Sequence, residues 1–448
     1  MTKRVIVLCA STAIIGLSAQ AQPPIQMRPQ ISVRPTIAVT PMGSSAGTAR
    51  LQALRRRGAV RVDVARLNPQ AIRSATQGEM VTLQLRPDVA IQARTAAVDQ
   101  LDGGLIAFRG EVDSSSADLP PGLATLIVNG DRITGSVRGP SGELYQIRPL
   151  ADGSSAVVQV DFNSLPADEP PDQANAAAPG GMASADQGGL LRASFSGGGQ
   201  PRVRTDLRAQ SNLTVLRRAL NWREILRINP ELFWPRITVQ VFYTASAASA
   251  AGDMTALANL AVTESNDAFR ASGVRAQFQL VGGVTELTYS EAGKSFEQMN
   301  SDFNSNSTAQ AQRNANQADI TVLIVNDDAY CGRANSIGGG ADVASVVVNW
   351  SCATGYYSFA HEIGHLAGTR HNPEVDGTNT PYAYGHGYLH MTAPRWRTIM
   401  GYNNGCDCPR IQLWSTPSVS HNDHAAGDAD HNNAQVWNTR ASVMAAWR

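Results

Sequence analysis

Residues 361–371 read HEIGHLAGTRH and hold three of the eight histidines in a chain of 448 residues. Residues four apart lie one above the other on the same face of an α-helix, so a helix here places the imidazoles of His361 and His365 together. Gly368 tolerates the positive φ that ends a helix sharply. The chain can then turn back and bring His371 to the same point. This spacing predicts three nitrogen ligands for one metal ion, and solvated histidines on an amphipathic helix are the alternative interpretation.

Three histidine ligands are typical of a catalytic zinc site. Zinc binds histidine nitrogen at about 2.0–2.1 Å in a roughly tetrahedral arrangement, so three protein ligands leave a fourth position for water. Glu362 follows the first histidine and would lie beside that open position. Zinc lowers the pKa of bound water, and a nearby carboxylate can take its proton and pass it to a departing amine. We therefore expect one catalytic zinc ion and hydrolysis of peptide bonds.

The motif resembles the zinc signature of the metzincin metallopeptidases at every fixed position. Metzincins also carry a methionine turn downstream, and this chain has RTIMGY with Met400. Two stretches are similar to the bacterial reprolysin-like branch, especially the peptidyl-Asp metalloendopeptidase family: TESNDAFRASGVRAQFQLVG (263–282) and YAYGHGYLHMTAPRWRTIMGYNNGCDCPRIQLWSTPSVS (382–420). The resemblance covers most of 236–448 and implies an endopeptidase that acts on protein or peptide substrates.

Three positions around the motif need interpretation. Reprolysins commonly have an aspartate after the third histidine, where this chain has Asn372. The resemblance implies that Tyr402 acts either as a fifth zinc ligand or as a group that stabilises the oxyanion. The alternative is that Tyr402 only packs in the core. Met400 is expected to be a hydrophobic floor, because a thioether is a poor zinc ligand.

The resemblance also implies a pocket for an acidic side chain after the cleaved bond. Its candidate lining residues are Arg395, Arg397 and Arg410, with ordinary surface arginines as the alternative. The segment 413–420, LWSTPSVS, would wall this pocket. A substrate could add as an extra strand at an edge strand near Ser345–Trp350.

Residues 206–448 show an α/β pattern. Strands are expected at 236–244, 275–282, 320–325 and 345–350, and helices at 254–272, 356–371 and 433–447. The predicted fold is a metzincin-type α/β (α+β) catalytic domain with a mixed twisted sheet and a zinc-binding helix.

The N-terminal half has a different organisation. Residues 1–21 are typical of a signal peptide, which predicts a secreted protein, extracellular or periplasmic, cleaved near Ala21. Residues 22–50 are expected to be disordered and 163–205 to be a flexible linker, because both are rich in Pro, Ala and Ser. Between them, 51–162 carries strand-like runs and a predicted hairpin turn at 129–131, which indicates a small β-rich propeptide domain.

A zymogen of this kind needs a means of latency. Residues 22–330 contain no cysteine that could bind the zinc ion. An acidic residue could substitute, with Asp131 as a candidate, although Asp131 also suits a plain turn. Steric cover by the β-rich domain is the other interpretation.

Four cysteines remain after the signal peptide, namely Cys331, Cys352, Cys406 and Cys408. Export predicts two disulfides. We favour Cys331–Cys352, which leaves a small Cys406–Cys408 ring; cross-pairing and a structural zinc are the alternatives. Of the five remaining histidines, His386 and His390 precede the methionine turn, and the other three lie with aspartates in HNDHAAGDADHNN (421–433), where a calcium site is weighed against a polar loop.

Composition excludes other classes of protein. The formal net charge is zero, which gives no electrostatic case for a nucleic-acid partner. Nothing after the signal is long and apolar enough for stable membrane association. The prediction is a secreted zinc endopeptidase made as a zymogen, of unknown oligomeric state. The alternatives are a secreted non-catalytic binding module or adhesin on a metzincin fold, and a zinc hydrolase such as a deacylase.

Overall fold

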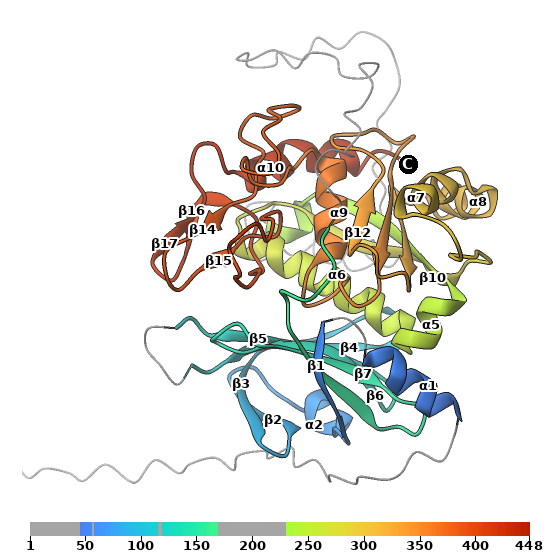
Figure 1. Cartoon of the computed structure of the whole chain (residues 1–448), viewed down its shortest axis with the longest axis vertical. Helices are drawn as coiled ribbons and strands as arrows, with labels where there is room; N and C mark the ends of the chain where they lie inside the picture. The colour runs from blue at the N-terminus through green and yellow to red at the C-terminus, as the bar shows by residue number, and fades with distance from the viewer. Residues whose placement is uncertain (1–44, 56–57, 115–118, 169–229) are drawn as a thin grey trace, which may run out of the picture.

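The computed structural model describes residues 45–55, 58–114, 119–168 and 230–448. We call 45–168 the N-terminal unit and 230–448 the C-terminal unit; the first lies beneath the second (Figure 1). The predicted signal peptide, most of the segment 22–50, residues 169–205 of the predicted linker and residues 206–229 lie outside the described residues.

The N-terminal unit is built on one antiparallel eight-stranded sheet with the order β1-β8-β7-β6-β5-β4-β3-β2. Alternating apolar residues form its core, which explains why several strands could be read from the sequence. Asn129 pairs with Arg132 across the predicted hairpin turn. The elements are β1 Ala59–Ala65, α2 Pro69–Arg73, β2 Met80–Arg86, β3 Val89–Gln100, η1 Asp102–Gly104, β4 Ile106–Val112, β5 Gly122–Asn129, β6 Arg132–Arg138, β7 Leu144–Pro149 and β8 Ser155–Val160.

Helix α1 (Ser45–Leu54) begins inside the segment expected to be disordered up to residue 50. Tertiary contacts account for this difference. Leu54 is buried, and the Arg50 guanidinium donates hydrogen bonds to the carbonyl oxygens of Ser249 (3.2 Å) and Pro149 (3.3 Å). These partners are remote in sequence, so composition alone could not reveal them.

The C-terminal unit contains a five-stranded sheet with the order β10-β9-β11-β13-β12. All neighbours are parallel except β12, which runs antiparallel to β13, so the predicted mixed α/β fold is confirmed. The sheet and its helices are η3 Pro230–Phe233, β9 Arg236–Tyr243, α5 Ala245–Ala251, α6 Met254–Ala271, β10 Gln277–Glu286, α7 Phe296–Ser305, α8 Ser307–Asn316, β11 Ile320–Val325, β12 Gly332–Ala334, β13 Ser345–Asn349 and α9 Ser358–Ala367. The remaining elements are β14 Leu389–His390, β15 Trp396–Arg397, β16 Thr416–His421, β17 His424–Ala426 and α10 Asn433–Met444.

The edge strand next to the histidine motif is β12, and the expectation that placed it near Ser345–Trp350 was wrong. Strand β13 is interior, with β11 on one side and β12 on the other. Strand β12 consists of only Gly332, Arg333 and Ala334, which is too short to show any periodicity in the sequence.

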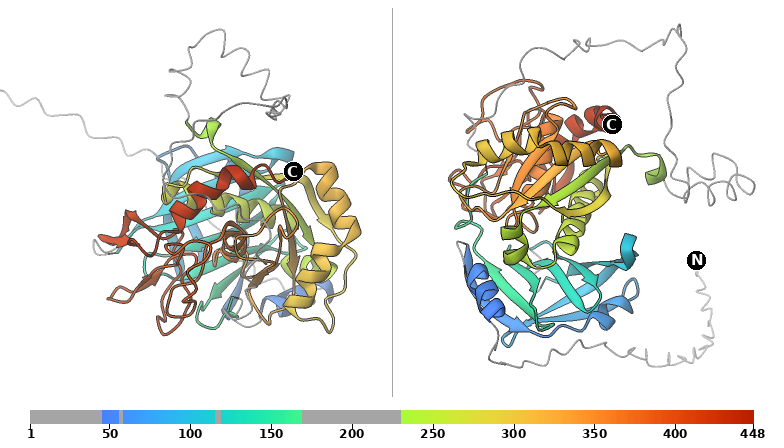
Figure 2. Two further views of the ribbon diagram at one scale, coloured as in Figure 1. Left: turned by 90° about the horizontal axis from the view of Figure 1, so that it is seen from above. Right: turned by 90° about the vertical axis from the view of Figure 1, so that its right-hand side faces the viewer.

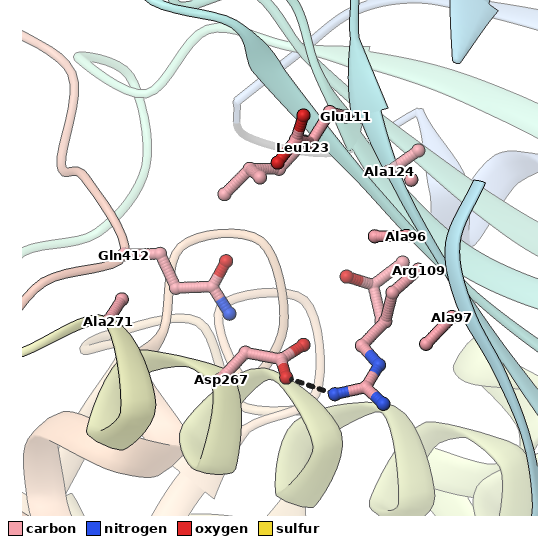
Figure 3. Close-up of a pocket in the computed structure, with 11 residues that line it drawn as sticks. Ala96, Ala97, Arg109, Glu111, Leu123, Ala124, Asp267, Ala271 and Gln412 are labelled. Atoms are coloured by element: carbon pink, nitrogen blue, oxygen red, sulfur yellow. Dashed lines mark hydrogen bonds and ion pairs between the residues drawn. The ribbon is translucent and has the colours of Figure 1, made fainter. Parts of the chain in front are cut away.

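Helix α6 lies at the junction of the two units, above strands β5 and β6 (Figures 1 and 2). An apolar cluster joins Leu260 of this helix to Leu105 and Ile127 of the sheet below. Next to it is a cavity of about 310 Å³, where Asp267 of α6 accepts a 2.7 Å hydrogen bond from Arg109 (Figure 3). The two units therefore share a packed and charged interface. Among the described residues, every helix is too short or too polar to span a bilayer.

Candidate metal centre

Helix α9 and the glycine that ends it bring the three histidines together. Gly368 has a φ of 108°, and its N–H donates to the carbonyl oxygen of His365 at 2.9 Å. A Cβ at this position would lie 2.8 Å from Cγ of Pro381, so both conformation and space require glycine. The chain then reverses, and the Arg370 N–H donates to Gly385 at 2.7 Å. This turn places His371 opposite the helix.

The three imidazoles converge in the protein interior. The Nε2 atoms of His361 and His371 are 3.0 Å apart, and one ring nitrogen from each of His361, His365 and His371 falls within a single group whose atoms lie within 4.8 Å of one another. Nδ1 of His361 donates to the carbonyl oxygen of Ile399, and Nδ1 of His365 donates to that of Thr369, both at 2.9 Å. With Nδ1 protonated, each Nε2 keeps its lone pair for a metal ion.

The protonation state of the three imidazoles also suits metal binding. Burial lowers the pKa of His361 to about 3 and that of His365 to about 4, and it lowers the pKa of His371 well below its usual value. The imidazoles are therefore neutral, which is the form that binds metals. Two nitrogens bound tetrahedrally at 2.0–2.1 Å from zinc would lie about 3.3 Å apart, close to the observed 3.0 Å. Zinc fits this donor set.

Glu362 is fully buried beside this group, where a glycine of the edge strand makes room for it. A Cβ at Gly332 would lie 2.6 Å from both Cγ and Oε1 of Glu362. The carboxylate therefore lies directly against the backbone of β12. Its carboxylate oxygen falls within 4.8 Å of a ring nitrogen of His361. The structure thus places a buried carboxylate next to His361, the first of the three imidazoles.

The methionine turn lies directly under the first histidine. Ile399, whose carbonyl oxygen accepts from His361, precedes the buried Met400. The Tyr402 ring is 5.1 Å from that of His371, centroid to centroid, and its backbone N–H donates to Oδ1 of Asn372 at 2.8 Å. Asn372 therefore ties the end of the histidine motif to the methionine turn.

Asp168 also lies at this centre, although it is remote in sequence. It is only 2% exposed and pairs with Arg410, and its Oδ1 accepts a 3.0 Å hydrogen bond from the Ser358 hydroxyl. Burial alone would raise the pKa of Asp168, but the positive charge of Arg410 holds it well below its usual range. Asp168 falls in the predicted linker 163–205 and was not among the expected site residues. Its setting, LPADEPP, looks like any solvated Pro-rich segment.

The candidate latency residue Asp131 lies elsewhere. It is exposed in the turn between β5 and β6, where it lines a surface hollow with Asn129 and Arg132. The structure therefore contradicts a place for Asp131 at the metal centre. The plain turn was the better interpretation.

The three candidate arginines have different surroundings. Arg395 is exposed. Arg397 is buried and donates to the carbonyl oxygen of Gly401 and to the Tyr356 hydroxyl, at 2.7 and 2.9 Å. Arg410 is buried 4.3 Å above the Tyr356 ring and pairs with Asp168. Of the three, Arg410 therefore presents its charge to the site.

Two disulfides join Cys331 to Cys352 and Cys406 to Cys408, as the favoured pairing had it. The histidine-rich segment 421–433 was weighed above as a calcium site. Among the described residues, the groups of three or more metal-binding side chains are the histidine triad and Asp168, His361 and Glu362. His431 instead pairs with Asp428 at 2.6 Å.

This fold and this histidine site define a class of enzyme, the zinc metallopeptidases, and residues 235–415 match the model of metallo-peptidase family M12, Reprolysin_5. A peptidyl-Asp metalloendopeptidase of Stenotrophomonas maltophilia is 38% identical over 375 residues, 79% of this chain and 80% of the relative. One from Xanthomonas campestris is 34% identical over 373 residues, 79% of each chain. One from Pseudomonas fragi is 50% identical over 95 residues, 21% of this chain and 61% of the relative. The chain belongs to the peptidyl-Asp metalloendopeptidase family, which confirms the predicted family and enzyme class.

Proposed function

We propose that the chain is a secreted zinc endopeptidase made as a zymogen, with His361, His365 and His371 as zinc ligands. The observation that carries this proposal is the convergence of three buried, neutral imidazoles beside the carboxylate of Glu362. Membership of the metalloendopeptidase family supports it. When bound, zinc lowers the pKa of water and polarises the scissile carbonyl.

Glu362 is the proton carrier in this proposal. One of its carboxylate oxygens accepts a proton from the attacking water, and the same group donates that proton to the amine nitrogen as the C–N bond breaks. Tyr402 has its hydroxyl 3.3 Å from a peptide carbonyl oxygen, that of Asp168. A hydroxyl placed in this way can donate a hydrogen bond to the scissile carbonyl oxygen as negative charge develops. Met400 serves as packing beneath the ligands.

The proposed substrate class is proteins and peptides with an acidic residue after the cleaved bond. The relatives are named peptidyl-Asp metalloendopeptidases, which supports this preference. Arg410 supports it as well, because this buried guanidinium already binds a carboxylate beside the histidines. Arg410 is thus the residue that selects the acidic side chain.

Export and latency complete the proposal. The signal-like residues 1–21 support secretion, and the two disulfides suit an oxidising compartment. The N-terminal unit is assigned as the propeptide, because its packed interface with the C-terminal unit suits a cover that is removed later.

The test uses the C-terminal unit, which is obtained by cleaving the full-length chain between residues 168 and 230 and removing the N-terminal unit. We expect it to cleave casein, to lose this activity with a chelator and to regain it with zinc. Glu362→Ala should bind zinc normally but cleave at least about a thousandfold more slowly, because the proton carrier is missing. Equal cleavage by the variant would refute the proposed role of Glu362. Zinc binding without cleavage by the parent would favour the non-catalytic binding module.

A further inference from the structure

The last described residues of the N-terminal unit run into the metal centre. After β8, the Asp161 N–H donates to Gly58 at 2.8 Å, and the side chain of Asn163 accepts from that of Asn403 at 2.9 Å. Leu165 is buried against Gly58. These contacts anchor the segment to the start of β1 and to the chain just after the methionine turn.

Residues 166–168, which we call the plug, lie at the edge strand. The Cys331 N–H, just before β12, donates to the carbonyl oxygen of Ala167 at 2.8 Å. A backbone bond of this kind is what an extended peptide makes when it adds to an exposed sheet edge. While the plug is in place, a substrate chain cannot use the same N–H.

The side chain of Asp168 occupies a position made for a carboxylate. Arg410 and the Ser358 hydroxyl bind its oxygens, and Tyr402 donates to its backbone carbonyl. One of its carboxylate oxygens lies within 4.8 Å of ligand atoms of His361 and Glu362. The plug therefore meets the groups that the proposed mechanism needs.

Arg410 favours the presence of a carboxylate at this position. A buried guanidinium that loses its carboxylate is left with an uncompensated charge, which is strongly unfavourable. When Asp168 leaves, binding of another carboxylate to Arg410 in the same place becomes favourable. An acidic side chain of a substrate can provide that carboxylate.

We infer that Asp168 is a built-in substrate mimic, which keeps the enzyme latent by placing its carboxylate on Arg410 beside the three histidines. The inference rests on the proposed function and names the regulation of that same site. The chemistry that selects an acidic substrate then also holds the plug. Loss of the charge at residue 168 should loosen the plug and open the pocket to an outside carboxylate.

The first measurement is amide hydrogen exchange on the full-length, chelator-treated chain, which needs no activity. In Asp168→Asn, exchange at Cys331 and across 163–168 should rise at least about tenfold, since breaking a buried ion pair is costly. Asp152→Asn, in the exposed turn after β7, is the matched control and should exchange like the parent. Asp168→Glu keeps the charge and should retain most of the protection. Unchanged exchange in a folded Asp168→Asn would overturn the inference.

The second measurement asks whether the pocket accepts an outside carboxylate. N-acetyl-aspartate amide should raise the Tm of chelator-treated Asp168→Asn, whereas N-acetyl-asparagine amide should not. The parent should respond to neither, because Asp168 already fills the pocket. A parent that responds as strongly as the variant would also overturn the inference. Both readouts are independent of catalysis, so a failure of the proposed peptidase activity would be seen separately, in the casein assay.

Discussion

At the residue scale, the site depends on contacts that leave no room for change. Glu362 lies against the backbone of Gly332, and Nδ1 of His361 is held by the carbonyl oxygen of Ile399. Buried polar groups held in this way keep their positions because the surrounding atoms are closely packed. A substitution that adds atoms here must displace its neighbours and so should change the geometry of the site.

Gly332→Ala is the sharpest test at this scale. The added methyl would lie 2.6 Å from Glu362, so the carboxylate must move. We expect kcat/KM of the processed enzyme to fall about a hundredfold, as for a displacement of about 1 Å in an active site. Zinc content should stay at the parent level. Gly377→Ala, where the nearest atom would be 3.8 Å away, serves as the control. Normal activity in Gly332→Ala would contradict a positioned Glu362.

At the element scale, helix α9 delivers two histidines and its terminus delivers the third. The i, i+4 spacing places His361 and His365 on the same face of the helix. The position of His371, by contrast, depends on the chain reversal at Gly368. Helix α6 also ends near a glycine, Gly273, with a φ of 70° and open space around it. The two glycines separate the effect of backbone strain from that of steric overlap.

Gly368→Ala should lower stability and loosen the metal. A left-handed conformation costs a non-glycine residue about 1–2 kcal/mol, and the methyl would also overlap Pro381. We expect a Tm several degrees lower and weaker zinc affinity, measured by competition with a chelator. Gly273→Ala should lower the Tm by the strain alone and leave zinc affinity unchanged. Equal effects on zinc in both variants would mean that Gly368 does not position His371.

At the scale of the whole molecule, the two units are held by more than the plug. Glu264 of α6 is buried at their junction, where it accepts hydrogen bonds from the Ser136 hydroxyl of β6 and, at 2.8 Å, from the Gly355 N–H. Arg138, Arg148 and Tyr357 lie around it. Burial raises the pKa of Glu264 to about 7, even though these hydrogen bonds and arginines act in the opposite direction.

Association of the two units should therefore depend on pH. Once the units separate and water reaches Glu264, its pKa should return towards the ordinary glutamate value of 4.5, so the separated form loses its proton first as pH rises. Association is fully favoured below about pH 4.5 and weakens up to about pH 7, by up to about 3 kcal/mol. The full-length chain is cleaved between residues 168 and 230, and association of its two units is measured by gel filtration between pH 5 and pH 8. In Glu264→Gln this pH dependence should disappear, and its persistence would rule out Glu264 as the cause.

Much of the C-terminal fold could be predicted because its signals are local. The apolar run of β11, the periodicity of α6 and the spacing in α9 each lie within one element. Strand β12 could not be predicted, since three residues carry no period. Helix α1 was missed for a different reason, because its stabilising partners lie elsewhere in the chain.

The sequence by itself determined the three histidines, Glu362 and the family, because helical spacing and a terminating glycine place neighbouring residues without help from distant ones. Only the tertiary structure decided which arginine faces the site and which carboxylate meets it. Asp168 and Arg410 are 242 positions apart and pair only after both units have folded and packed together. No local pattern encodes such a contact, since its energy comes from burial of two opposite charges at an interface between remote segments.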